Sequence, residues 1–266
     1  MSEDPWAWLR QFTEARIALG RCGASWPTDQ WLAFRLAHAQ ARDAVLSPFD
    51  QEALQAELAQ NAVASLRLRS AARDKNEFLT RPDQGRRLSS NARDFLEEYS
   101  RNNGPLAWAD VCLVISDGLS ARAVHQSAAP FALEFLACLA GAHLSATPVV
   151  LVEFGRVAVA DEVAALLRAR LAVILIGERP GLSSPNSLGA YMTYDPAPGR
   201  TDETRNCISN IRPGGLSIAE GVRKLCYLAQ KALELKFSGF RLKDDMPAHY
   251  LPFGPAQGLP PCLGGE

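Results

Sequence analysis

The sequence predicts an α/β protein in which a parallel sheet domain follows an N-terminal helical region. Three apolar runs support the sheet: VCLVIS at 111–116, TPVVLVE at 147–153 and LAVILI at 171–176. Runs that are apolar throughout are typical of strands buried on both faces of a sheet. Because helix-length segments separate these runs, the sheet is expected to be parallel and Rossmann-like, with helices on both faces.

The connecting segments have the spacing of amphipathic helices. DGLSARAVHQ and the residues up to Leu139 form the first connection, and ADEVAALLRARL at 160–171 forms the second. Residues 177 to about 206 show no periodicity and predict a long loop. A further helix is expected after Ser217, which can cap it together with Glu220 in a capping box, and Gly239 suits its end.

The chain divides into three regions by pattern. Residues 1–82 predict a helical region, with helices in WLAFRLAHAQARDAV after Thr28 and over about 50–72. Leu32, Leu36 and Ala39 would share one face of the first of these helices. Residues 83–245 predict the α/β domain. Residues 246–266 are rich in Pro and Gly and predict a disordered tail.

Composition excludes several classes of protein. The 266 residues carry a net charge of −1 and 47% hydrophobic residues, so no strong field attracts nucleic acid or an anionic membrane. MSEDPWAWLRQFTEARIAL lacks the order of a secretory signal, and no later stretch approaches the length of a membrane span. We therefore expect a cytoplasmic protein. Six cysteines without CxxC spacing and four histidines without HExxH predict dispersed buried thiols rather than a metal site.

The ends of the three apolar runs are candidate ligand-binding loops. Ligands of open parallel sheets bind beyond the carboxyl ends of the strands, which here are SDGLSA (116–121), EFGRVA (153–158) and GERPGLSS (177–184). A crevice and three ordinary turns are equally compatible with these sequences. A dinucleotide site is disfavoured because DGLSARAV offers Gly118 alone in place of G-x-G-x-x-G, and neither a P-loop nor a serine nucleophile elbow occurs.

The long loop contains the most suggestive side chains. Its prolines and tyrosines would make it stiff, which suits a platform for a large flat ligand or for another subunit. Glu178 could accept hydrogen bonds from ligand amides, or form a salt bridge with Arg179, Arg205 or Arg212, which is the more frequent arrangement for a lone Glu. Cys207 has the pattern of a small buried apolar residue.

Several stretches closely resemble the small subunit of ethanolamine ammonia-lyase. They are LVISDGLSA, ILIGERPGLSSPNSLGAYMTY, GRTDETRNCISNIRPGGLS and KFSGFRLKDD, with RIALGRCGASWPTD and FRLAHAQARDAV nearer the start, and the resemblance covers about residues 13–245. It implies a subunit that is active only with a larger barrel subunit, in a hetero-oligomer of six copies of each. Adenosylcobalamin would be bound between the two subunits, and the large subunit would hold ethanolamine, which becomes acetaldehyde and ammonia.

The resemblance also implies which residues contact the cofactor. Carried over position by position, the cobalamin contacts fall on Val157, Glu178 and Cys207, with no catalytic residue and no metal ligand in this chain. Cys207 would provide contact rather than reactivity, because nothing nearby in sequence lowers the pKa of its thiol. The family's occurrence in bacterial microcompartments makes such packaging a second expected location.

Two alternatives remain open. The chain could be a structural or interaction subunit that shields the cofactor and contributes little binding energy. It could also be a stand-alone nucleotide-dependent enzyme on a Rossmann-like sheet, which the missing glycine fingerprint disfavours.

Overall fold

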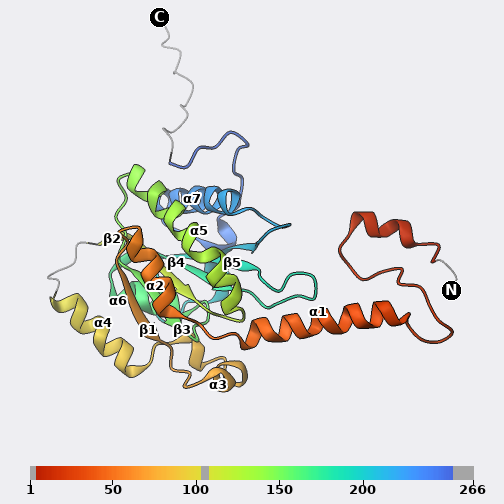
Figure 1. Ribbon diagram of the computed structural model, residues 1–266. Helices are drawn as coiled ribbons and strands as arrows, with labels where there is room; N and C mark the ends of the chain where they lie inside the picture. Colours follow the sequence, from red (N-terminus) through yellow and green to blue (C-terminus); the bar gives the residue numbers. More distant parts are fainter. Residues whose placement is uncertain (1–3, 103–107, 254–266) are drawn as a thin grey trace, which may run out of the picture.

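The computed structural model describes residues 4–102 and 108–253, and its centre is a six-stranded sheet (Figure 1). The strands are β1 (Ser65–Arg69), β2 (Ala109–Ser116), β3 (Val149–Glu153), β4 (Ala169–Gly177), β5 (Leu188–Tyr194) and β6 (Arg205–Ile211). They follow the order β1-β3-β2-β4-β5-β6. The three strands expected from the apolar runs are confirmed as β2, β3 and β4, which run parallel to one another and to β1.

Helices cover both faces of the sheet, as the apolar runs predicted. The α-helices are α1 (Thr28–Leu46), α2 (Gln51–Gln60), α3 (Lys75–Thr80), α4 (Ser90–Asn102), α5 (Ala121–Gly141), α6 (Val159–Leu166) and α7 (Ile218–Leu235). Short 3-10 turns are η1 (Ala7–Phe12), η2 (Gln84–Arg86), η3 (Asp202–Thr204) and η4 (Gly239–Arg241). One core cluster packs α2, α5 and α7 against the sheet, and the other packs α4 and α6 against its opposite face.

The expectation of a purely parallel sheet is wrong for its last two strands. β5 is antiparallel to both β4 and β6, so the sheet is mixed, and a Rossmann-like classification stays a prediction. β5 lies inside the structureless loop expected over 177–206, and β6 begins at the end of that loop. LGAYMTY was missed because Gly and Ala have low strand propensity and because Pro, Ser and Asn flank it.

The N-terminal region also supplies a strand. The helix expected over about 50–72 ends at Gln60, and SLRLR at 65–69 pairs with β3 as β1. In that segment Leu66 and Leu68 alternate with polar residues, which is the pattern of an edge strand. Residues 65–69 therefore belong to the sheet of the α/β domain, although they precede the boundary expected at 82.

Residues 4–46, which we call the N-terminal arm, extend away from the body of the protein (Figure 1). The arm contains η1 and α1. The helix was expected to begin after Thr28, but Thr28 is its first residue, and no side chain caps it. Leu32 and Leu36 are 57% and 60% exposed. The apolar face expected on this helix is therefore not buried within the described chain.

The last long helix begins as the sequence predicted and ends differently. The Ser217 hydroxyl accepts a hydrogen bond from the Glu220 N–H at 3.2 Å, which confirms the cap. The helix ends at Leu235, because Lys236 takes the left-handed conformation at φ 60°, and Gly239 lies in η4 instead. Beyond it, Tyr250 packs edge to face on Tyr227 of α7, and residues 254–266 of the expected tail lie outside the described residues.

One helix corrects the expectation that no stretch could span a membrane. α5 is long and apolar enough for a span by length and composition, but half of its most apolar window is buried inside the protein. Its buried residues, which include Phe131 and Phe135, belong to the core cluster shared with α2 and α7. We interpret α5 as the central core helix.

The cysteines are free thiols over the described ranges, but they are not uniformly buried. Cys112 and Cys226 are buried as expected, whereas Cys22 and Cys207 are exposed. Within those ranges no group of three or more His, Cys, Asp or Glu side chains could hold a metal ion.

Candidate functional site

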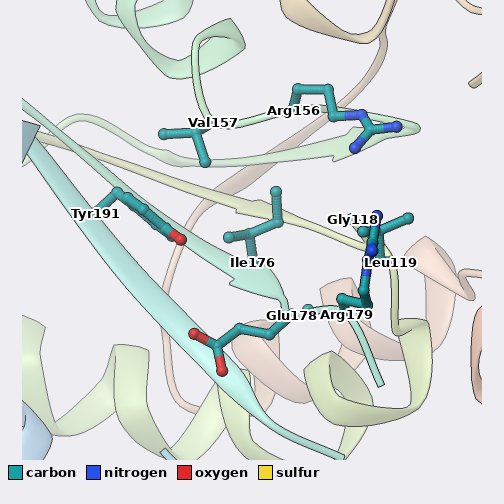
Figure 2. Close-up of a pocket in the computed structure, with 9 residues that line it drawn as sticks. Gly118, Leu119, Arg156, Val157, Ile176, Glu178, Arg179 and Tyr191 are labelled. Carbon is teal, nitrogen blue, oxygen red and sulfur yellow. The ribbon is translucent and has the colours of Figure 1, made fainter. Parts of the chain in front are cut away.

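A pocket of about 420 Å³ lies at the carboxyl ends of β2 and β4 (Figure 2). Its lining residues are Gly118, Leu119, Arg156, Val157, Ile176, Gly177, Glu178, Arg179 and Tyr191. All but Ile176 and Tyr191 come from the three loops that the sequence marked as ligand-binding candidates. The three loops therefore form a crevice together and are not merely separate turns.

Two glycines allow the loops to approach closely enough to form this pocket. The Leu119 N–H donates to the Gly177 carbonyl at 2.9 Å, so the loop after β2 touches the end of β4. Gly118 has φ +53°, and a Cβ there would lie 2.5 Å from the same carbonyl oxygen. A side chain at Gly177 would collide with the Ser120 and Asp117 carbonyls. Any larger residue at either position would separate the two walls.

Glu178 ties the pocket to the two antiparallel strands. Its Oε2 accepts a hydrogen bond from the Ser187 hydroxyl at 2.5 Å and one from the Asn210 N–H at 3.2 Å. In the described chain it forms no salt bridge with the three expected arginines. Arg205 pairs with Asp161 and Arg212 with Glu14 instead, whereas Arg179 lies beside Glu178 without pairing with it. The salt-bridge interpretation of Glu178 is therefore wrong.

Val157 supplies part of the apolar wall. It follows Arg156 in the connection between β3 and α6 and is half-buried against the core cluster that includes Ile176. Tyr191 from β5 packs on the same cluster. The pocket thus combines apolar contact from these side chains with a polar edge formed by Glu178.

Cys207 lies beside the pocket rather than in its lining. It pairs with Tyr191 across β5 and β6, so one lining residue separates it from the cavity. The side chain is exposed, which overturns the expectation of a buried cysteine. Partial desolvation, together with the nearby Glu178 charge, raises the pKa of the Cys207 thiol, although the Tyr191 hydroxyl acts in the opposite direction. A raised pKa keeps the group as a thiol, so it is unsuited to nucleophilic attack.

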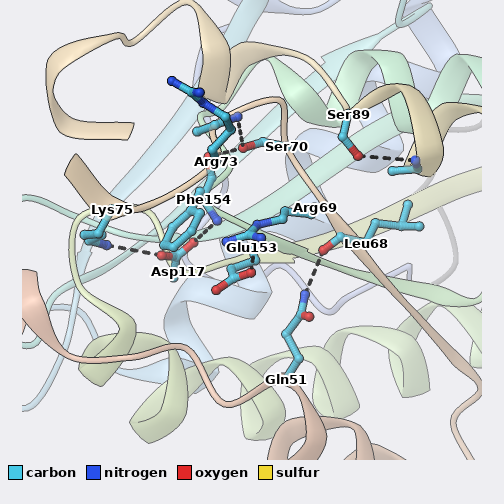
Figure 3. A network of polar contacts seen from close by, with 12 residues as sticks. Gln51, Leu68, Arg69, Ser70, Arg73, Lys75, Ser89, Asp117, Glu153 and Phe154 are labelled. Carbon is cyan, nitrogen blue, oxygen red and sulfur yellow. Dashed lines mark hydrogen bonds and ion pairs between the residues drawn. The ribbon is translucent and has the colours of Figure 1, made fainter. Parts of the chain in front are cut away.

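A largely buried ion pair between Lys75 and Asp117 joins two of the loops that form the pocket (Figure 3). The Lys75 ammonium donates to Asp117 Oδ2 at 3.2 Å and to the Gly118 carbonyl at 3.1 Å. Asp117 Oδ1 accepts from the Phe154 N–H at 2.7 Å. Asp117 thereby joins the loop after β2 to the loop after β3, and Lys75 joins both loops to α3.

Sequence reasoning missed Lys75 and Arg156, and considered Arg179 only as a salt-bridge partner of Glu178. Asp117, Arg156 and Arg179 lie inside the candidate ligand-binding loops, but no motif singles them out. Lys75, the partner of Asp117, is 42 residues away in a region expected to be helical, and no local sequence pattern predicts this ion pair.

Comparison with known proteins gives the family. Residues 3–243 match the family described as ethanolamine ammonia-lyase light chain (EutC). The chain is 53% identical to the ethanolamine ammonia-lyase small subunit of Pseudomonas fluorescens Pf-5, over 92% of this chain and 88% of the relative. It is 52% identical to that of Azotobacter vinelandii, over 92% and 90%. It is 53% identical to that of Xanthomonas campestris pv. campestris, over 91% and 88%. The chain belongs to the ethanolamine ammonia-lyase light-chain family.

Proposed function

We propose that this chain is the small subunit of an adenosylcobalamin-dependent ethanolamine ammonia-lyase and that its pocket holds one edge of the cofactor. The observation that carries the proposal is the meeting of Val157 and Glu178 in one pocket, with Cys207 directly beside it. Sequence resemblance alone had selected these three residues, and they come from three separate segments. When bound, adenosylcobalamin supplies the radical chemistry that converts ethanolamine to acetaldehyde and ammonia.

The lining of the pocket fits a corrin. A corrin has a flat apolar face and a fringe of amide arms, so it needs an apolar wall with hydrogen-bonding groups at the edge. Leu119, Val157 and Ile176 can provide the wall. Glu178 can accept hydrogen bonds from amide N–H groups, and Arg156 has a buried Nε–H with no partner in the described chain. A cavity of about 420 Å³ encloses only part of so large a cofactor, so a second surface must cover the rest.

The N-terminal arm supports a protein partner. Its exposed side chains include Trp6, Trp8, Phe12, Trp26 and Trp31, each between 46% and 72% exposed. Ring contacts join them in two groups, Trp8 with Phe12 and Trp26 with Trp31. Solvent-exposed groups of large aromatic residues are typical of an interaction surface. The Arg16 guanidinium donates to the Leu182 carbonyl at 3.2 Å, so the segment of the arm between η1 and α1 touches the loop that follows Glu178.

We assign this surface and the open side of the pocket to contact with the large subunit, which holds the substrate. This chain then contributes cofactor binding and no catalytic group. An assembly with six copies of each subunit, located in the cytoplasm or inside a microcompartment, is the arrangement that the family resemblance implies.

The function is tested by reconstitution. The chain should catalyse conversion of ethanolamine to acetaldehyde only when mixed with a cognate large subunit and adenosylcobalamin, and omission of any component should abolish turnover. Acetaldehyde formation can be followed through a coupled alcohol dehydrogenase. Activity or nucleotide binding by the isolated chain would favour the stand-alone enzyme instead. Co-assembly without turnover would mean that the substrate or the chemistry differs.

Replacement of Glu178 separates cofactor binding from a purely structural role. In the assembled complex, Glu178→Ala should raise the Kd for adenosylcobalamin by about tenfold or more, because a charged hydrogen-bond acceptor contributes roughly 1.5–3 kcal/mol. Glu178→Gln should have a smaller effect, since it retains an acceptor for Ser187. Both Kd values can be measured by absorbance titration.

The matched control is Glu98→Gln, which removes a carboxylate from the exposed face of α4 and should leave the affinity unchanged. Gel filtration reports whether the subunits still assemble. Intact assembly with unaltered cofactor affinity in Glu178→Ala would support the structural or interaction subunit.

A further inference from the structure

We propose that Arg156 and Arg179 form an anion subsite in the pocket, and that this subsite binds the phosphodiester of the cofactor's nucleotide loop. The inference rests on the proposed function and extends it to a specific group of the ligand. The phosphodiester is the negatively charged group in the side arms of a cobalamin, whose other arms are neutral amides. Two arginines with no carboxylate partner in the described chain, beside an apolar wall, are complementary to an anionic phosphodiester attached to an apolar corrin.

The charges that line the pocket do not balance. Arg156 and Arg179 are cationic, and Glu178 is the carboxylate among the lining residues. Glu178 is already engaged by Ser187 and Asn210. Figure 2 shows the two arginines toward one side of the pocket, whereas Glu178 and Tyr191 lie toward the other. Within the described residues neither arginine forms a salt bridge.

Other nearby charges do not compensate Arg156. Burial lowers the pKa of the Arg156 guanidinium, and the positive charges of Arg86 and Arg179 lower it further. Asp117 acts in the opposite direction, but its carboxylate is bound by Lys75. A bound anion would relieve this excess of positive charge, because it would be attracted by all three guanidinium groups.

The Arg156 side chain is held ready for a ligand. Its Nη2 donates to the Phe78 carbonyl at 2.9 Å, and its guanidinium lies 4.2 Å from the centre of the Phe78 ring. Its Nε is buried and has no hydrogen-bond partner in the described chain. A buried N–H without a partner is costly, so the arrangement favours an acceptor that arrives with the ligand. A guanidinium matches phosphate oxygens in geometry as well as in charge.

The test compares two corrinoids that differ in the nucleotide loop. Adenosylcobinamide lacks the phosphodiester and the base, but it keeps the corrin and most of its amides. In the complex with the large subunit, Arg156→Gln and Arg179→Gln should each raise the Kd for adenosylcobalamin by about tenfold, because one charge-assisted hydrogen bond is lost. Each should change the Kd for adenosylcobinamide by less than about twofold. Equilibrium dialysis measures both constants without turnover.

Arg67→Gln is the matched control, because it removes an arginine from exposed β1 outside the pocket and should change neither Kd. Arg156→Gln could disturb folding, because Arg156 also donates a hydrogen bond to the Phe78 carbonyl. Arg179 is exposed, so Arg179→Gln tests the subsite without this complication.

Equal weakening of both corrinoids by Arg179→Gln would overturn the inference, because the arginines would then contact the corrin amides. Unchanged binding of adenosylcobalamin by both variants would also overturn it. If the wild-type complex bound neither corrinoid, the proposed function itself would be wrong. That result differs from both results that overturn the anion subsite, since in those the wild type still binds adenosylcobalamin.

Discussion

Replacement of Arg205 by methionine is expected to lower the free energy of unfolding by about 3–5 kcal/mol, because it leaves a buried carboxylate without its partner. The Arg205 Nη1 lies 2.7 Å from Asp161 Oδ2, and the two side chains are 4% and 2% exposed. The same nitrogen donates to the Thr193 hydroxyl at 3.0 Å. The guanidinium therefore joins β6 to β5 and to α6 in the interior. Urea denaturation of the full chain, followed by circular dichroism, measures the loss.

The matched control for this prediction is Arg67→Met. Arg67 lies even closer to its partner Glu52, at 2.6 Å, but that carboxylate is 82% exposed. Removal of an exposed pair costs less than about 1 kcal/mol. A similar loss in both variants would show that burial does not determine the effect, and the prediction for Arg205 would be wrong.

A double variant isolates the cost of the unpaired charge. Arg205→Met with Asp161→Leu replaces the whole pair by apolar side chains, and such replacements are often close to neutral. We expect it to recover at least half of the stability that Arg205→Met loses. If the two losses simply add, the side chains are not coupled and the stabilisation comes from other contacts of Arg205.

The pair also bears on the candidate site. Arg205 is opposite Thr193 in the strand pairing, and Cys207 is opposite Tyr191 two residues further along. A change of register by one residue would place Cys207 on the other face of β6. The contact of Arg205 with Asp161 thus helps to fix the register of RNCISN. The position of Cys207 therefore depends on a residue of α6.

Sequence patterns predicted the three central strands that are buried on both faces, and missed β1 at one edge of the sheet and β5 and β6 at the other. β2, β3 and β4 are continuous apolar runs, so their burial is visible in the residues themselves. β5 contains Gly189 and Ala190, and β6 alternates irregularly around a bulge. These strands exist because each has a neighbour to pair with, and that neighbour is not encoded in the local pattern.

The candidate site divides in the same way. Its loops follow from the ends of the predicted strands, but that pattern was equally compatible with a crevice and with ordinary turns, and the family resemblance selected Val157 and Glu178. The side chains that support or charge the pocket could not be placed in this way. Arg156 binds the Phe78 carbonyl across 78 residues, and Lys75 binds Asp117 across 42. Such pairings depend on how α3 packs against the loops after β2 and β3, which no spacing in the sequence reports.

Lys75→Met should lower the free energy of unfolding by about 3 kcal/mol at neutral pH, at the lower end of the range for broken buried pairs. Asp117 is 1% exposed, whereas Lys75 retains 20% exposure, so some solvent can reach the carboxylate when the ammonium is removed. Methionine keeps a long side chain but also removes the cation–π contact of the ammonium nitrogen, which lies 4.9 Å from the centre of the Phe78 ring. The loss therefore combines the unpaired carboxylate with this weaker contact, which contributes about 0.5–1 kcal/mol at an exposed site. The control Lys231→Met breaks an exposed pair with Glu234 and should cost less than about 0.5 kcal/mol.

The pH dependence of this loss separates the charge from packing. Burial already raises the pKa of Asp117 in the native protein, although Lys75 opposes the shift, and removal of Lys75 should raise it further. A group with a raised native pKa favours the folded state when it is protonated. The difference between Lys75→Met and the wild type should thus be small at a pH below the ordinary pKa of an aspartate. It should grow as the pH rises from the pKa of Asp117 in the wild type to its higher pKa in the variant, because only there do the two native states differ in protonation. A difference that stayed constant from pH 3 to pH 8 would assign the loss to packing of α3, and Asp117 would not be the group that needs Lys75.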